Sequence, residues 1–161
     1  MEYKKELKKL IQVLYKKNIK LCVAESVTGG KFAYEIIKNK NASKVIDYSL
    51  VTYSNNSKSK FLKLKLPLKK YNPVSIEIAQ LMAKEVVKFS KNKKVIGVSC
   101  TGQAGPGLIN KDLKIGTVFI GVNYNKKIIS IKKSFEKKSR LSVINFTVSQ
   151  MIKQCLKVID D

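Results

Sequence analysis

Two short apolar runs of this chain, both rich in β-branched residues, end in turns of glycine and small polar residues. The run at 19–24 leads into ESVTGG (25–30), and the run at 94–100 leads into TGQAGPG (101–107). Either turn alone is compatible with an ordinary connecting turn that has no functional role. Because ligands of open α/β sheets bind beyond the carboxyl ends of the strands, the pair of turns favours one cleft that both of them line.

Apolar residues along the rest of the chain alternate between helical and strand-like spacing. Helices are predicted over 2–17, 31–38, 58–66, 75–90 and from 139 onward, and strands over 19–24, 45–53, 94–100, 115–122 and 127–135. The turn-prone residues 123–126 join the last two strands into a hairpin, which makes the sheet mixed. This order predicts an α/β fold, a three-layer α/β/α sandwich that forms one domain over 1–161.

Length and hydropathy place further limits on the protein class. A chain of 161 residues suits a single domain. The N-terminus lacks the apolar core of a signal peptide, and no window reaches the about 18 apolar residues of a membrane span. The cysteines Cys22, Cys100 and Cys155 are spaced like core residues rather than disulfide partners. We therefore expect a soluble cytoplasmic protein without a membrane partner.

The absence of histidine excludes several kinds of catalytic site. A Ser-His-Asp triad is impossible. Zinc sites draw mainly on Cys and His, and the three cysteines lie far apart in the sequence, so no metal site is predicted. No cofactor is expected either.

The formal net charge of +22 suggests anionic ligands. All the basic residues except Arg140 are lysines, and they are spread over every segment, with the densest run at 58–70. This run lacks the interleaved aromatic residues of a nucleic-acid stacking surface. Nucleic-acid binding is therefore an alternative rather than the leading interpretation, and phosphorylated small molecules fit the charge as well.

The first turn has the layout of a nucleophile beside the start of a helix. Ser26 follows a strand, and the backbone amides of Thr28, Gly29 and Gly30 lie where an oxyanion could bind. Without histidine, a serine nucleophile needs another base, and a lysine whose pKa is lowered by burial or by neighbouring positive charge can serve. The residues alone leave open which lysine acts.

Four ordered motifs resemble the C-terminal domain of the competence/damage-inducible protein A (CinA) family, which includes nicotinamide-nucleotide amidases. They are AESVTGG (24–30), LVTYSNNSK (50–58), TGQAGPG (101–107) and IGTVFI (115–120). The resemblance spans about 5–158. The family usually has Cys where Val27 stands and an aliphatic residue in place of Gln103, and it has more glycine and proline than residues 108–114 contain.

The resemblance implies hydrolysis of the carboxamide of nicotinamide mononucleotide, with Ser26 as nucleophile and Tyr53 and Lys58 in proton transfer. The substrate-binding residues that it implies are Glu25, Thr28, Gly29, Gly30, Asn55, Thr101, Gly102, Gly105 and Arg140. For Glu25 the alternative role is to hold its turn. Arg140 is a candidate contact to phosphate or to another subunit. The expected partners are the pyridine mononucleotide and a second copy of the chain, a dimer first. A non-catalytic nucleotide-binding module of the same fold is the alternative.

Overall fold

One five-stranded sheet in the order β2-β1-β3-β4-β5 forms the centre of the fold. The computed structural model describes residues 3–64 and 72–160. Its strands are β1 (Lys20–Glu25), β2 (Ile46–Val51), β3 (Val95–Gly102), β4 (Thr117–Tyr124) and β5 (Lys127–Ser134). The first three strands are parallel, and β4 and β5 are antiparallel to their neighbours. The predicted mixed sheet is confirmed.

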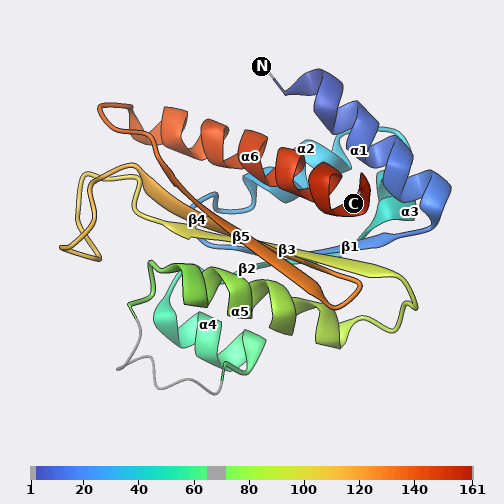
Figure 1. Cartoon of the computed structure of the whole chain (residues 1–161), viewed down its shortest axis with the longest axis horizontal. Coiled ribbons are helices and arrows are strands. Elements are labelled where there is room, and N and C mark those ends of the chain that lie inside the picture. The colour runs from blue at the N-terminus through green and yellow to red at the C-terminus, as the bar shows by residue number, and fades with distance from the viewer. Residues whose placement is uncertain (1–2, 65–71, 161) are drawn as a thin grey trace.

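Helices cover both faces of this sheet (Figure 1). One face carries α1 (Lys4–Lys17), α2 (Lys31–Ile37), α3 (Ala42–Val45) and α6 (Arg140–Asp160). The other face carries α4 (Asn55–Leu62) and α5 (Ile76–Val86). The 3-10 turn η1 (Val87–Phe89) follows directly after α5. This arrangement confirms the predicted three-layer α/β/α sandwich. Within the described residues, no helix is long and apolar enough to cross a bilayer.

Local sequence signals explain several element boundaries. The Ser75 hydroxyl accepts a hydrogen bond from the Ile78 amide and caps α5, as predicted. Asn125 and Lys126 have φ values of 50° and 66°. Two consecutive residues of positive φ make the tight turn whose twist matches that of a β-hairpin. The turn is therefore two residues shorter than the predicted 123–126.

Two apolar cores pack against the two faces of the sheet. The larger lies under α1, α2 and α6 and includes Leu10, Phe32 and Met151, and the smaller lies under α5 and includes Ile78 and Met82. The three cysteines are buried and unpaired, as their apolar surroundings in the sequence predicted. Cys22 and Cys100 point to opposite cores because Cys100 is paired with Glu25, three residues along the strand from Cys22, and successive residues of a strand alternate between the two faces of the sheet.

Other boundaries differ from the predictions. The single-turn helix α3 was not predicted because four residues carry no helical period, and α4 begins at Asn55 rather than at residue 58 because Ser54 caps it. Phe89 and Leu141 fall on the apolar stripes of the helices predicted over 75–90 and from 139 onward, but they are 41% and 64% exposed because they lie at the ends of the observed elements. The helix predicted over 58–66 reaches past the described residues, because residues 65–71 lie outside them.

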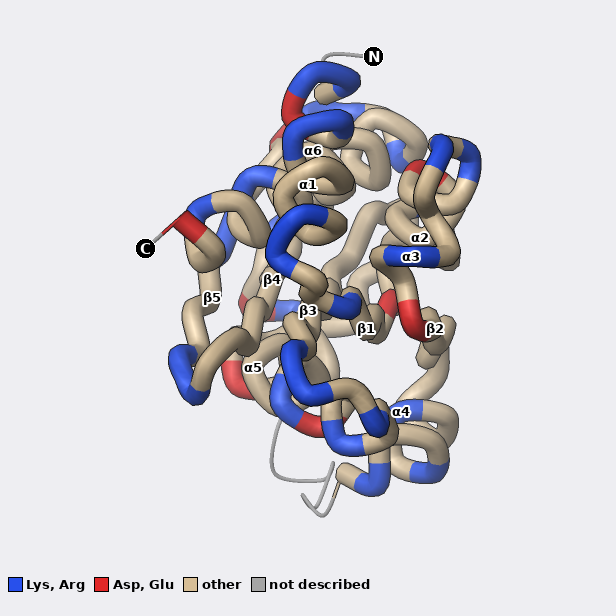
Figure 2. The backbone as a smooth tube through the Cα atoms, turned by 90° about the vertical axis from the view of Figure 1, so that its right-hand side faces the viewer, with Lys and Arg blue, Asp and Glu red and all other residues tan. Residues whose placement is uncertain are grey.

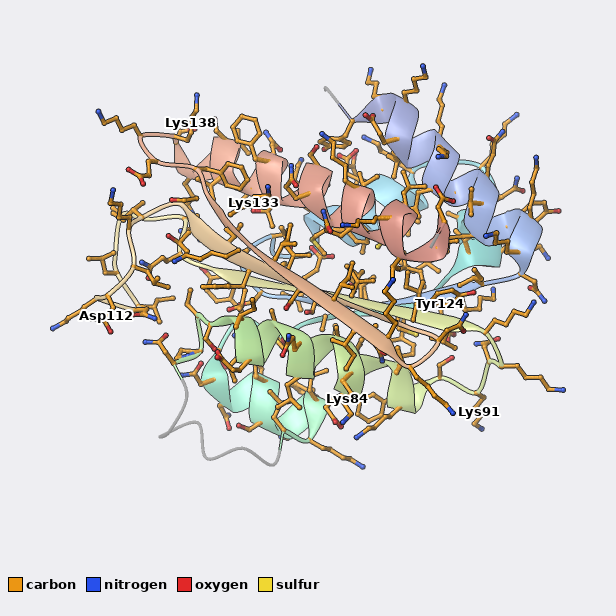
Figure 3. All side chains as sticks on the ribbon, viewed as in Figure 1. Lys84, Lys91, Asp112, Tyr124, Lys133 and Lys138 are labelled. Carbon is orange, nitrogen blue, oxygen red and sulfur yellow. The ribbon has the colours of Figure 1, made fainter. Side chains whose placement is uncertain are left out.

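Positive charge is distributed over the whole molecule (Figure 2). Lysines lie on α1, α3, α4 and the β4–β5 turn, whereas acidic residues are few and scattered. Lys138 is on the outside of the molecule beside the start of α6, and Asp112 lies at the outer tip of the β3–β4 loop (Figure 3). Over residues 3–64 and 72–160 the lysines are distributed over many elements, in agreement with their spread along the sequence.

Candidate active site

The two sequence-predicted turns lie side by side at the carboxyl ends of β1 and β3. These strands are parallel neighbours in which Glu25 is paired with Cys100, and the Ser26 amide donates to the Cys100 carbonyl at 3.2 Å. The end of β2 joins them, since the Thr52 amide donates to the Glu25 carbonyl at 2.8 Å. The sheet topology thus brings residues from three separate motifs to one place.

A serine and a lysine are in direct contact at this place. Lys58 Nζ donates a hydrogen bond to Ser26 Oγ at 3.0 Å and lies 3.4 Å from the Tyr53 carbonyl oxygen. Lys58 belongs to α4, which is started by a capping box in which Ser54 and Ser57 bond each other's backbone amides. The helix begins just beyond β2 and directs Lys58 back toward the end of β1. Ser26 and Lys58, the nucleophile and proton-transfer residue that the family resemblance implied, are therefore in hydrogen-bond contact and form a dyad.

Burial changes the acid–base chemistry of this lysine. Only 2% of Lys58 is exposed, and the loss of hydration lowers its pKa from 10.5 to about 8, an effect that nearby Cys100 partly opposes. Neighbouring positive charge, the other cause considered for such a lysine, does not contribute to the shift, and Lys31 and Lys60, the lysines considered as its source, have other partners. Lys31 pairs with Glu35 at 3.8 Å, and Lys60 lies over the Phe61 ring. Desolvation is the cause of the shift.

Glu25 holds the first turn from the inside. Its carboxylate is fully buried and accepts hydrogen bonds from the Thr28 hydroxyl and from the amides of Gly30, Phe32 and Ala33 at 2.6–3.1 Å. A negative charge at the start of α2 is also favoured by the helix dipole. Of the two roles considered for Glu25, the structure supports the turn and not the substrate contact.

The same network corrects the roles expected for the residues that follow Ser26. Thr28 is 4% exposed, and its hydroxyl contacts Glu25 and the Cys100 sulfur. The Gly29 amide donates to the Ser26 carbonyl, and the Gly30 amide donates to Glu25. Of the three amides at which an oxyanion site was predicted, those of Thr28, Gly29 and Gly30, the last two are already bonded within the turn and do not form such a site.

Replacement of Glu25 tests this structural role. We expect Glu25→Ala to lower the free energy of unfolding by about 3–5 kcal/mol, because three backbone amides and one buried hydroxyl lose their acceptor. Glu25→Gln keeps the shape and one oxygen and should cost about 1–2 kcal/mol. Urea denaturation followed by circular dichroism measures both. A loss below about 1 kcal/mol for Glu25→Ala would contradict the role.

A cleft of about 340 Å³ opens beside the Ser26 hydroxyl. Its lining comes from both glycine turns, the end of β2 and the start of α6, and consists of Ser26, Val27, Tyr53, Gly102, Gln103, Ala104, Gly105, Pro106, Gly107, Leu108, Ile109 and Arg140. At Gly102 an added Cβ would lie 2.7 Å from Val118 and 2.9 Å from the Thr117 carbonyl, so the close approach of β4 requires glycine there. Gly102, Gly105 and Arg140 thus lie at the cleft, as predicted.

The other six predicted substrate-binding residues do not line this cleft: Glu25, Thr28, Gly29, Gly30, Asn55 and Thr101. Thr101 is 1% exposed and its hydroxyl donates to the Pro73 carbonyl at 2.7 Å, so it supports the wall from behind. Asn55 is exposed at the start of α4, and Thr28 lies beneath the turn. Sequence analysis in turn missed Leu108 and Ile109, because a loop without periodicity carries no signal that assigns its residues to a cleft.

Arg140 connects the two sides of the cleft. Its guanidinium donates to the Gly105 carbonyl and, at 2.8 Å, to the Tyr53 hydroxyl. Within the part of the chain that the structure describes, the Tyr53 hydroxyl makes no hydrogen bond to Ser26 or Lys58. Tyr53 instead contacts the lysine through its carbonyl, and its side chain is 61% exposed. Its ring is therefore placed to meet a ligand rather than to relay a proton within the dyad.

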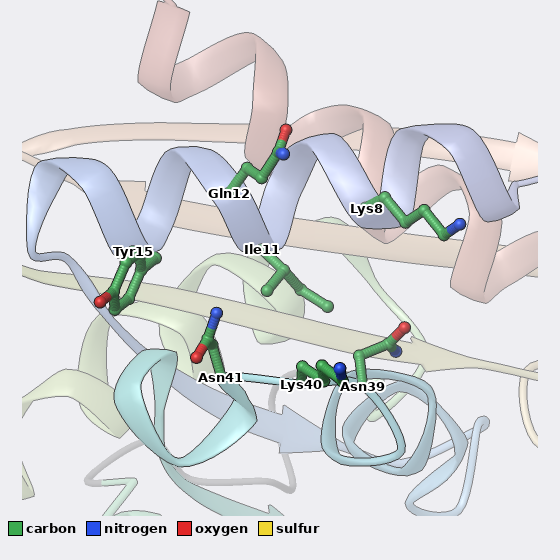
Figure 4. Close-up of a pocket in the computed structure, with 7 residues that line it drawn as sticks. All are labelled: Lys8, Ile11, Gln12, Tyr15, Asn39, Lys40 and Asn41. Carbon is green, nitrogen blue, oxygen red and sulfur yellow. The ribbon is translucent and has the colours of Figure 1, made fainter.

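A second cavity, of about 310 Å³, lies between α1 and the segment that joins α2 to α3 (Figure 4). Its lining residues are Lys8, Ile11, Gln12, Tyr15, Asn39, Lys40 and Asn41. None of the predicted site residues is among them. No group of three or more His, Cys, Asp or Glu side chains suited to a metal ion occurs over residues 3–64 and 72–160.

Comparison with known proteins places the chain among competence/damage-inducible proteins. Residues 4–159 match the model of the CinA C-terminal domain. A relative from Clostridium botulinum (strain Langeland) named as a competence-damage inducible protein is 38% identical over 144 residues, 89% of this chain. One from Alkaliphilus oremlandii with the same name is 36% identical over 115 residues, 71% of this chain. The chain spans about a third of the length of such curated relatives, since the matches cover 34% and 27% of them.

Solved structures agree with this assignment. A CinA superfamily protein from Escherichia coli superposes with a TM-score of 0.86 at 25% identity, covering 95% of this chain and 88% of that one. The competence/damage inducible protein CihA from Agrobacterium tumefaciens has the same fold, with a TM-score of 0.90 at 23% identity over 100% of this chain and 97% of that one. With the family model matched over nearly the whole chain, the protein belongs to the CinA C-terminal domain family.

Proposed function

We propose that this protein is an amidohydrolase that converts nicotinamide mononucleotide to nicotinic acid mononucleotide and ammonia. The observation that carries the proposal is the buried contact of Lys58 Nζ with Ser26 Oγ, together with a lysine pKa of about 8. An amine of that pKa is partly neutral near pH 7–8 and can accept the proton of a serine hydroxyl. Family membership adds the pyridine mononucleotide as the substrate that the motifs imply.

The reaction runs in two steps that share the same base. Ser26 Oγ attacks the carboxamide carbon while its proton passes to Lys58 Nζ, and collapse of the adduct breaks the C–N bond, with the proton delivered to the departing ammonia. An ester on Ser26 remains. Water then attacks this ester, Lys58 takes a proton from the water, and cleavage of the C–O bond returns that proton to Ser26. The products are the carboxylate and ammonia, and the enzyme is regenerated.

The lining of the cleft suits a flat ring that carries an anionic tail. Tyr53, Leu108 and Ile109 offer an exposed aromatic ring and two apolar side chains, and Arg140 adds a guanidinium at the mouth. Arginine forms paired hydrogen bonds to phosphate oxygens. The overall charge of +22 also attracts a phosphate monoester electrostatically.

The proposal is tested by incubating the purified protein with nicotinamide mononucleotide and measuring ammonia together with the acid product. Release of both in equal amounts is the expected result. The nucleoside that lacks the phosphate is the matched control, and we expect it to have the higher KM. Binding of the mononucleotide without ammonia release would favour the alternative, a non-catalytic nucleotide-binding module.

One partner proposal accompanies this function, and one further functional candidate stands beside it. A dimer is the proposed assembly, and light scattering of the purified protein measures it. Charge-driven nucleic-acid binding remains the third functional candidate, and it predicts affinity for a polynucleotide that falls steeply with salt.

A further inference from the structure

Gln103 lies at the point where the second glycine turn leaves β3. Its backbone joins the end of β3 to the start of β4. The Gln103 amide donates to the Thr117 carbonyl at 3.0 Å, and the Gln103 carbonyl accepts from the Gly116 amide at 2.8 Å. Its side chain is 2% exposed. A buried polar amide of this kind is costly unless its hydrogen-bonding groups are all used.

The side-chain amide uses its groups to close the β3–β4 loop on itself. Nε2 donates to the carbonyls of Asn110, Leu113 and Lys114 at 2.7–3.3 Å. Oε1 accepts from the amides of Ile109 and Asn110 at 3.1 and 2.9 Å. An aliphatic side chain at this position makes none of these bonds. Residues 109–114 are thus held together by hydrogen bonds to the buried side chain of Gln103.

The β3–β4 loop is also hydrogen-bonded to the segment that leads into α5. The Asn110 side chain donates to the Val74 carbonyl at 3.2 Å and accepts from the Asp112 amide at 3.0 Å. The loop is therefore held at two points, by Gln103 from within and by the start of α5 from outside. Its tip, marked by Asp112 in Figure 3, projects beyond the end of the sheet.

This loop supplies two of the large apolar side chains that line the cleft. Leu108 and Ile109 line the cleft although they are 50% and 60% exposed. Large apolar side chains that stay exposed inside a ligand cleft are typical contact surfaces for the apolar part of a ligand. The Ile109 amide is one of the two that donate to Gln103, so Gln103 directly fixes the backbone of a residue that lines the cleft.

We infer that Gln103 is a positioning residue that sets substrate specificity by holding Leu108 and Ile109 as an apolar wall. The wall contacts the part of the substrate that lies away from the scissile amide. The inference rests on the proposed function for the identity of that substrate. The reacting groups, Ser26 and Lys58, come from β1 and α4 and share no hydrogen bond with Gln103 among the described contacts. The wall should therefore affect binding more than the chemical step.

The test compares Gln103→Met, which keeps length but makes no amide hydrogen bonds, with Gln12→Met on the exposed face of α1. In the free protein we expect hydrogen exchange at the amides of Ile109 and Asn110 to accelerate about tenfold in Gln103→Met. We also expect KM for the mononucleotide to rise about tenfold with kcat within about threefold of the wild type. Gln12→Met should change neither quantity.

Three results would overturn the inference. Unchanged exchange at residues 109 and 110 would show that Gln103 does not hold the loop. Faster exchange with an unchanged KM would show that the loop is no part of the binding wall. A fall in kcat as large as the fall in kcat/KM would show that Gln103 acts on the reacting groups. If the wild type released no ammonia, the proposed function would fail, and calorimetric binding of the mononucleotide to both proteins would take the place of KM.

Discussion

Ser26→Ala is expected to lower kcat for the release of ammonia by at least about 10³-fold, with little effect on the fold or on nucleotide affinity. The hydroxyl is the atom that forms the covalent ester in the proposed mechanism, so no other group in the dyad replaces it. Ser26 is a small side chain at the edge of the cleft, 6% exposed, and Lys58 keeps its contact with the Tyr53 carbonyl. Ammonia release measures the rate, and calorimetry measures the affinity.

Ser43→Ala is the matched control for this variant, because Ser43 is exposed on α3, away from the cleft. It should leave kcat and the affinity unchanged. Retention of more than about a tenth of the wild-type turnover by Ser26→Ala would refute Ser26 as the nucleophile. A parallel loss of nucleotide affinity would instead assign Ser26 to substrate binding.

Lys58→Arg is expected to be as inactive as Lys58→Met, with kcat reduced by about 10³-fold or more in both. Arginine keeps the positive charge but stays protonated at all accessible pH values, so it cannot accept the serine proton. In the wild type, a base of pKa about 8 is neutral in about a tenth of the molecules at pH 7 and nine tenths at pH 9. The rate should therefore rise about tenfold between these pH values.

Stability measurements separate this catalytic role from a loss of folding. The folded state holds the lysine proton less tightly than the unfolded state, whose pKa is about 10.5, so burial of the charged form costs about 3 kcal/mol at pH 7. The wild type should gain stability as pH rises from 8 to 10.5. Lys58→Met should be more stable than the wild type at pH 7 and lack this gain. Near-normal turnover of Lys58→Arg would make Lys58 an electrostatic contact and end its assignment as the base.

The fold was readable from the sequence because its elements obey local rules. The apolar runs before Ser26 and Thr101 have the length and β-branched content of buried strands, and the hairpin follows from a tight turn between two such runs. The elements that were missed are those whose cause is not periodic. The turn α3 contains only four residues, and the true start of α4 depends on the capping box of Ser54 and Ser57.

The candidate site was readable only in part. Glu25, Thr28 and Thr101 belong to motifs of the family, but a motif does not say whether a side chain faces the cleft or the turn beneath it. Leu108 and Ile109 had no motif at all, and Gln103 stood out only as a departure from the family pattern. Its role depends on hydrogen bonds to residues six to eleven positions away, which no spacing rule predicts.

By itself, the sequence determined the order of helices and strands, excluded chemistry that needs histidine, and marked Ser26 as a nucleophile candidate at the end of a strand. The tertiary structure brought Lys58, which only the family resemblance had implied, into contact with that serine and buried it. Burial lowers the pKa of Lys58, and burial is a property of the packed layers, because hydration is lost only when α4 closes over the end of β1.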